Sequence, residues 1–204
     1  MRVRHTERVH PVFLYRPGDR LSEAELCAAR LDGDVIDIDD MFVPADLVDS
    51  PALRAAVLVA HRQGRERLAF TGASAAWVHG AGDRPPHRHE VQPVGDRRVR
   101  MPPSPRLLLH DLRLDPGDTV VIGGALVATP VRTLLDLVRG ITRHPGNAVW
   151  ARALLSVRPD ILDETADRLD AYRRTPGHRQ ARAVLDEALR ETSAARLPQD
   201  DVTR

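Results

Sequence analysis

An arginine and an aspartate one helical turn apart are the first residues whose types and spacing could do chemistry. Arg132 and Asp136 stand at positions i and i+4 in the segment GALVATPVRTLLDLVR, residues 124–139. A cation in the first turn of a helix opposes the helix dipole, at a cost of about a few tenths of a kcal/mol. Two interpretations stay open. Arg132 binds an anion or a partner at the helix start, or it forms a half-buried ion pair with Asp136 that ties the helix to a sheet.

Arginines in two segments are candidates for contact with DNA phosphates. Residues 84–106 carry six arginines, which stand against the three acids Asp83, Glu90 and Asp96, a local excess of +3. Alternating positions on adjacent strands would gather these arginines on one face of a sheet. The other interpretation is a solvated hairpin. Two arginines of the N-terminal segment complete the candidate set: Arg20, Arg30, Arg84, Arg88, Arg97, Arg98, Arg100 and Arg106.

Histidines and aspartates at short spacing suggest metal or nucleotide chemistry, but each pattern is incomplete. His87-x-His89 would place two imidazoles on one side of a strand, and no nearby third ligand completes a zinc site. The acids over 32–40 lack the order of an EF-hand calcium loop. Asp37-x-Asp39 is similar to a nucleotidyltransferase pair, but no Gly-Ser element precedes it. We therefore expect no catalytic residue, no metal and no cofactor.

The absence of lysine excludes several enzyme classes. All of the basic residues are arginine, whereas a P-loop and a Schiff-base enzyme each require a lysine amine. A nuclease with a PD-(D/E)xK site needs its lysine as well. The formal net charge of +1 gives no bulk field that favours nucleic acid. We expect the protein not to be an enzyme.

Capping patterns predict the N-terminal elements that position these residues. Ser22 and Glu25 have the spacing of a capping box, which predicts a helix over 22–31. The segment VIDIDDMFV predicts a hairpin over 34–43 that turns at Asp39-Asp40. A helix followed by a hairpin has the outline of the last part of a winged helix-turn-helix.

Downstream, the pattern changes to short strands and then to helices. Ser50-Pro51 begins a second helix, a strand covers 68–70 and a short helix covers 74–79. Regular turn signals indicate a small meander-like sheet, with strands near 88–93, 97–101, 106–110, 118–122 and 125–128. Thr129-Pro130 then begins a helix that ends near 140. Further helices are expected near 147–155, 160–174 and 177–191.

These elements predict an α+β fold, in which a truncated winged-helix-like segment precedes a small mixed sheet with helices and a helical C-terminus. We expect an N-terminal arm and vestigial winged helix over 1–64, an α+β domain over 65–192 and a disordered tail over 193–204. No apolar run is long enough for a membrane span, and the N-terminus lacks a secretory signal. The single Cys27 cannot form an internal disulfide. A cytoplasmic protein without a membrane partner is therefore expected.

Three segments resemble the AbiEi-family antitoxins of actinobacteria, which are transcriptional regulators of type IV toxin–antitoxin systems. LAFTGASAAWVHG, residues 68–80, resembles their SAA-(W/L)-x-HG element. Residues 124–139 resemble their strand-to-helix element with its proline, arginine and aspartate. RRTPGHRQARAVLDEAL, residues 173–189, is similar to the arginine- and glycine-bearing helix that often follows. The resemblance covers roughly residues 16–190.

This resemblance implies partners as well as a fold. In that family a winged helix binds inverted repeats in its own promoter, and the C-terminal domain supports action against a nucleotidyltransferase toxin. Operator DNA and a cognate toxin are the expected partners. Trp77 is expected to be a core or interface anchor, and Arg132 and Asp136 become markers of the fold. Some relatives continue into an endonuclease domain, and we expect no nuclease activity in this chain.

The charge of the N-terminal segment leaves its role open. Residues 17–50 contain ten acids and two arginines, a net charge of −8, which is the wrong sign for a surface that follows DNA phosphates. In one interpretation the segment is a structural relic, or a protein-interaction module that has lost DNA binding and uses its acidic surface. In the other, Arg20, Arg30 and the N-terminal arm still contact DNA.

Overall fold

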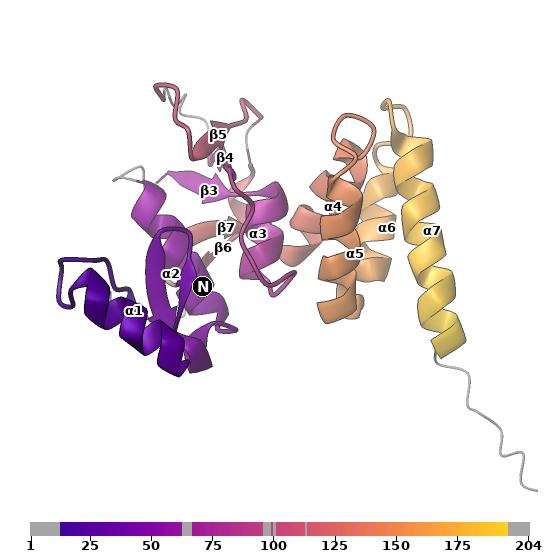
Figure 1. Ribbon diagram of the computed structural model, residues 1–204. Helices are drawn as coiled ribbons and strands as arrows, with labels where there is room; N and C mark the ends of the chain where they lie inside the picture. Colours follow the sequence, from indigo (N-terminus) through magenta and orange to yellow (C-terminus); the bar gives the residue numbers. More distant parts are fainter. Residues whose placement is uncertain (1–12, 63–66, 96–98, 100, 113, 196–204) are drawn as a thin grey trace, which may run out of the picture.

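The first helix and the hairpin after it form as predicted. The computed structural model describes residues 13–62, 67–95, 99, 101–112 and 114–195 (Figure 1). Helix α1, Glu23–Asp32, begins with the predicted capping box, because the Ser22 hydroxyl accepts from the Glu25 backbone N–H and the Glu25 carboxylate accepts from the Ser22 backbone N–H. Leu26 is its buried residue, so most of α1 faces solvent.

Strands β1, Val35–Ile38, and β2, Met41–Pro44, pair as an antiparallel hairpin. The turn residues Asp39 and Asp40 both have positive φ, +52° and +68°. A two-residue hairpin turn of this type requires that conformation at both positions, and aspartate tolerates it better than most side chains. Tyr15 exchanges two backbone hydrogen bonds of 2.9 Å with Phe42, so the described end of the N-terminal arm lies along β2.

A five-stranded mixed sheet follows, and its topology is not the predicted meander. The spatial order is β5-β4-β3-β7-β6. Pairs β3/β4 and β6/β7 are antiparallel, whereas β3/β7 and β4/β5 are parallel. Parallel neighbours require crossover connections, which turn signals along the sequence do not reveal. The strands are β3 Leu68–Phe70, β4 His89–Pro93, β5 Leu107–Leu109, β6 Thr119–Ile122 and β7 Ala125–Ala128.

The predicted strand over 97–101 falls largely outside the described residues, which exclude Arg97, Arg98 and Arg100. The two described residues of that range, Val99 and Met101, belong to no strand. The other predicted strands are confirmed with small changes at their ends.

Six further helices were found within the described part of the chain. The predicted helix over 160–174 is shorter, because a 3-10 turn at Pro159–Ile161 precedes it and the chain turns after Asp170. The last helix extends to Ala195, three residues into the predicted tail, and residues 196–204 lie outside the described residues. The helices are α2 Pro51–Arg62, α3 Gly72–Val78, α4 Pro130–Gly140, α5 Asn147–Val157, α6 Leu162–Asp170 and α7 His178–Ala195.

Two apolar cores hold these elements together, and α3 contributes to both. The first core joins the hairpin, α2 and the sheet, with Met41 and Phe70 among its buried members. The second lies among α4–α7, and Ala76 of α3 packs into it beside Leu134. Figure 1 shows α3 between the sheet and the α4–α7 layer, with α1 and α7 at opposite ends of the molecule. The predicted division at residue 64 falls within the first core.

The α+β fold class is therefore confirmed, including the helix-plus-hairpin segment that precedes the mixed sheet. Among the helices that the structure describes, none combines the length and the apolar character needed to cross a membrane.

Candidate functional site

Arg132 lies between two carboxylates in the first turn of α4. Its Nε donates to Asp136 Oδ2 at 2.8 Å, and its Nη1 donates to Asp118 Oδ2 at 2.7 Å. Asp118 stands just before β6 and also accepts from Arg168 of α6 at 2.9 Å. The arginine side chain is 11% exposed. The network therefore ties the sheet, α4 and α6 together.

The start of α4 is built as the sequence predicts. The Thr129 hydroxyl accepts from the Arg132 backbone N–H at 3.3 Å, and Pro130 occupies the first helical position. Burial lowers the pKa of Arg132, but the carboxylates of Asp136 and Asp118 raise it by more, so the guanidinium stays charged. This arrangement favours the structural interpretation of Arg132 and Asp136, because both are engaged with one another inside the protein.

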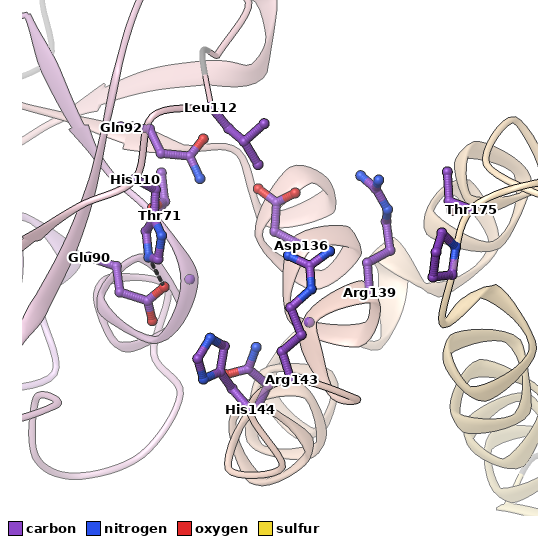
Figure 2. Close-up of a pocket in the computed structure, with 14 residues that line it drawn as sticks. Thr71, Glu90, Gln92, His110, Leu112, Asp136, Arg139, Arg143, His144 and Thr175 are labelled. Carbon is purple, nitrogen blue, oxygen red and sulfur yellow. Dashed lines mark hydrogen bonds and ion pairs between the residues drawn. The ribbon is translucent and has the colours of Figure 1, made fainter. Parts of the chain in front are cut away.

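A pocket opens between the sheet and the helical layer (Figure 2). Figure 2 shows Glu90 and His110 on the sheet side, facing Arg143 and His144 from the turn after α4. All three segments that carry the family resemblance contribute to the lining: residues 71–72 from the first, Asp136 and Arg139 from the second, and residues 175–176 from the third. The segments are distant in sequence, and they converge on this pocket of about 290 Å³.

Glu90 organises the sheet side of the pocket. Its Oε1 accepts from the Ala73 backbone N–H at 3.3 Å, and its Oε2 lies 2.9 Å from His110 Nε2. Gly72 has a φ of +54°, and a Cβ atom there would lie 2.6 Å from the Glu90 carboxylate oxygens. Glycine is therefore needed where the start of α3 meets this side chain. Across the pocket, the Arg139 guanidinium stacks on the Tyr172 ring, 3.8 Å from its centroid.

Among the arginines predicted to bind DNA, those that the structure describes do not gather on one sheet face. Arg88 and Arg106 lie just before strands β4 and β5, and Arg84 lies in the preceding loop. Arg97, Arg98 and Arg100 lie outside the described residues. Arg20 is exposed in the turn before α1, and Arg30 lies in the last turn of α1. The predicted basic face is therefore not seen in the part of the chain that is described.

Several of these arginines contact acids of the hairpin instead. Arg106 Nη1 lies 2.7 Å from Asp39 Oδ1, and its Nη2 contacts Asp40. Arg30 and Arg84 approach the two carboxylate oxygens of Asp37 at 3.8 and 3.9 Å. The acidic hairpin thus neutralises part of the positive charge that would otherwise face DNA.

The turn of the hairpin is docked against the sheet. The Asp39 side chain is 4% exposed, and its Oδ2 lies 2.7 Å from His89 Nε2 and 2.8 Å from His61 Nε2. Burial raises the pKa of Asp39, but the contacts with His61 and His89 outweigh burial and hold the pKa well below its ordinary value. Asp39 is therefore a carboxylate. These contacts hold the hairpin turn against the end of α2 and the start of β4.

Sequence reasoning missed this cluster because its members come from three separate segments. His89 was considered only with His87, which is exposed. His89 contacts the Asp39 side chain at the hairpin turn and the His61 ring at the end of α2. The one available signal was the pair of adjacent aspartates, which indicated a hairpin turn. It did not indicate that Asp39 would contact His61 and His89.

Arg54 of α2 was also missed, and it explains the position of Trp77. Its buried guanidinium donates to the carbonyl oxygens of Val48, Trp77 and Gly82 at 2.9–3.0 Å, and to Asp49 Oδ1 at 3.1 Å. It also lies over the Trp77 ring, 5.3 Å from the centroid. Trp77 is fully buried, so of the two predicted roles it has that of a core anchor.

Fold and pocket together define a small α+β protein in which three distant segments build one site. The family model of the AbiEi antitoxin C-terminal domain matches residues 68–187, from the first residue of β3 into α7. Because the match spans more than half of the chain, the protein belongs to the AbiEi antitoxin family. A comparison with curated proteins found no match. The family resemblance inferred from the sequence is confirmed, and the matched region contains the pocket and the Arg132 network.

Proposed function

We propose that this protein is a non-enzymatic antitoxin. We infer that it counteracts a nucleotidyltransferase toxin by binding a basic surface of that toxin, rather than by binding promoter DNA. Membership of the AbiEi antitoxin family supports the antitoxin role. The route through protein contact rests on one observation. The acids of the N-terminal segment are exposed apart from Asp39, whereas the nearby Arg106 is held by Asp39 and Asp40. The surface that would face a partner is therefore negative.

Three exposed carboxylates define an acidic face: Asp32, Asp34 and Asp46. The Asp34 carbonyl oxygen accepts from the Ala45 backbone N–H at 3.0 Å, which places the end of α1 beside the segment after β2. An enzyme that handles nucleotides and nucleic acid has a basic binding surface, and an acidic face complements such a surface.

Growth rescue tests this proposal. The full chain is expressed together with its proposed nucleotidyltransferase toxin, under separate inducible promoters. Wild-type protein is expected to restore colony formation. A triple variant, Asp32→Asn, Asp34→Asn and Asp46→Asn, removes three charges from the acidic face and is expected to lose most of the rescue, because the charge attraction to the toxin is lost.

The matched control removes three exposed carboxylates at the other end of the molecule, by Asp163→Asn, Asp167→Asn and Glu187→Gln. This control is expected to rescue as wild type does. Failure of the wild-type chain to restore growth would contradict the antitoxin role. Equal rescue by both triple variants would leave the antitoxin role intact and contradict the acidic face.

Promoter binding is the second candidate function, favoured by the exposed arginines that flank the hairpin. Arg84 is 82% exposed, and Arg20, Arg30 and Arg88 are exposed as well. A gel shift at low salt with the promoter fragment of its own operon tests it. The primary proposal predicts no shift for the purified chain. A shift that disappears on replacing Arg20 and Arg30 by glutamine would establish the second function instead.

A further inference from the structure

We propose that Asp39, His61 and His89 form a binding site for a divalent transition-metal ion, with zinc as the best fit. The three residues come from the hairpin turn, the last turn of α2 and the first residue of β4. Their ligand atoms, one carboxylate oxygen and two imidazole nitrogens, all lie within 4.8 Å of one another. Two histidines and one carboxylate are a ligand set that zinc and other borderline metal ions accept, with one position left open.

Both imidazole rings place their Nε2 atom close to one carboxylate oxygen. His89 Nε2 and His61 Nε2 lie 2.7 and 2.8 Å from the single oxygen Asp39 Oδ2. Around a tetrahedral zinc ion with bonds of about 2.0–2.1 Å, neighbouring ligand atoms are separated by about 3.3 Å. The two distances from Asp39 Oδ2 to the imidazole nitrogens therefore need to lengthen by about 0.5–0.6 Å to admit an ion.

His61 provides the second observation that points to a ligand. Its Nε2 is buried and makes no hydrogen bond, although it lies within 2.8 Å of Asp39 Oδ2. The nitrogen approaches the oxygen from a direction that does not suit an N–H donor. A buried polar atom without a hydrogen bond is costly. A metal ion near Asp39 Oδ2 would give this nitrogen a partner.

Side chains behind the ligands are placed to orient them. Asp39 Oδ1, the oxygen that does not face the histidines, accepts from Arg106 Nη1 at 2.7 Å. His89 Nδ1 lies 3.5 Å from the Ser74 hydroxyl, which lets Nδ1 carry the proton when Nε2 binds a metal ion. Hydrogen bonds of this kind fix the tautomer and orientation of metal ligands. His89 is 0% exposed and His61 is 14% exposed, so the site is sheltered from water.

One of the three ligands, Asp39, also lines a cleft together with His87, Arg84 and Arg106. A metal ion bound by Asp39, His61 and His89 would cross-link the hairpin to α2 and to the sheet. We infer that metal binding fixes the docked position of the hairpin and so stabilises the folded state. This role is independent of the proposed action on a toxin.

Titration of tag-free, chelator-treated full-length protein with Zn²⁺ tests the site. Competition against a chromophoric chelator is expected to show one equivalent bound, and Co²⁺ is expected to give the visible absorption of a tetrahedral complex. Asp39→Asn keeps a residue that tolerates the positive φ of the turn while removing the carboxylate. This variant and His61→Asn are each expected to weaken binding by more than ~100-fold, since even the loss of an outer-shell partner costs 10–100-fold.

The matched control is His144→Gln, which removes an exposed histidine from the other side of the molecule and is expected to bind as wild type does. Zn²⁺ is also expected to raise the melting temperature of the wild type and of His144→Gln, but not that of Asp39→Asn. Absence of a bound equivalent in the wild type would overturn the proposal. Equal affinity of Asp39→Asn, with circular dichroism showing that it is folded, would overturn it too.

Discussion

Replacing Arg132 by methionine is expected to destabilise the fold by about 3 kcal/mol, at the lower end of the range for breaking a buried ion pair. The side chain is 11% exposed and lies 2.8 Å from Asp136, which is 18% exposed. Its loss leaves the Asp136 carboxylate half-buried without its arginine. Asp118 keeps a second partner, Arg168 at 2.9 Å, so its contribution to the loss is smaller.

Urea denaturation measures this loss as a change in the free energy of unfolding. The matched control is Arg182→Met on α7, where Arg182 and Asp186 have the same i, i+4 spacing and the same 2.8 Å distance. Those side chains are 37% and 46% exposed. An exposed pair contributes about 0–1 kcal/mol, so the control is expected to stay within that range.

The two variants together decide between the structural and the binding interpretation of Arg132. A loss below about 1 kcal/mol for Arg132→Met, equal to that of the control, would refute the structural interpretation. If that stable variant also failed to rescue growth, Arg132 would be a contact residue for a partner. A large loss of stability that Asp136→Leu partly restores in the double variant would confirm the ion pair.

Three further outcomes are expected. Burial lowers the pKa of His79, so below pH ~6.5 the unfolded chain binds more protons than the folded protein. The free energy of unfolding therefore falls as the pH drops, by at most about 1.4 kcal/mol per pH unit. His79→Gln should flatten this slope, as measured by urea titrations at several pH values. Gly123→Ala places a Cβ atom 2.3 Å from the Ala52 carbonyl oxygen, whereas Gly95 has open space around it and also a positive φ. In thermal melts, Gly123→Ala should therefore lower stability by about 1–3 kcal/mol more than Gly95→Ala does. Arg54→Met leaves three carbonyl oxygens without their donor and should lower the free energy of unfolding by about 3 kcal/mol or more. Urea denaturation followed by tryptophan fluorescence measures this loss.

Local patterns predicted the elements of this fold well. The capping box at Ser22 and the cap at Thr129 depend on residues three positions apart, so the sequence contains all that is needed to identify them. The hairpin turn at Asp39-Asp40 was found for the same reason. Apolar spacing along 130–140 identified the buried face of α4.

Contacts between distant segments were not predictable in this way. Asp118 is a partner of Arg132 across 14 positions, and His89 meets Asp39 across 50. Neither pairing leaves a periodic signal in the sequence, because each depends on how separate elements pack against one another. The basic face over 84–106 stays a prediction, because Arg97, Arg98 and Arg100 lie outside the described residues. The contact of Arg106 with the acidic hairpin was not predictable either, since Asp39 lies 67 positions away.

Titration calorimetry between the purified chain and its proposed nucleotidyltransferase toxin tests whether the acidic face binds that toxin. An acidic face that binds a basic toxin predicts a complex whose affinity falls as salt is raised, because charges of opposite sign drive the encounter. It also predicts that the triple variant of Asp32, Asp34 and Asp46 weakens the complex, whereas the triple variant of Asp163, Asp167 and Glu187 does not. Absence of any complex at low salt would contradict the account, as would an affinity that both triple variants leave unchanged.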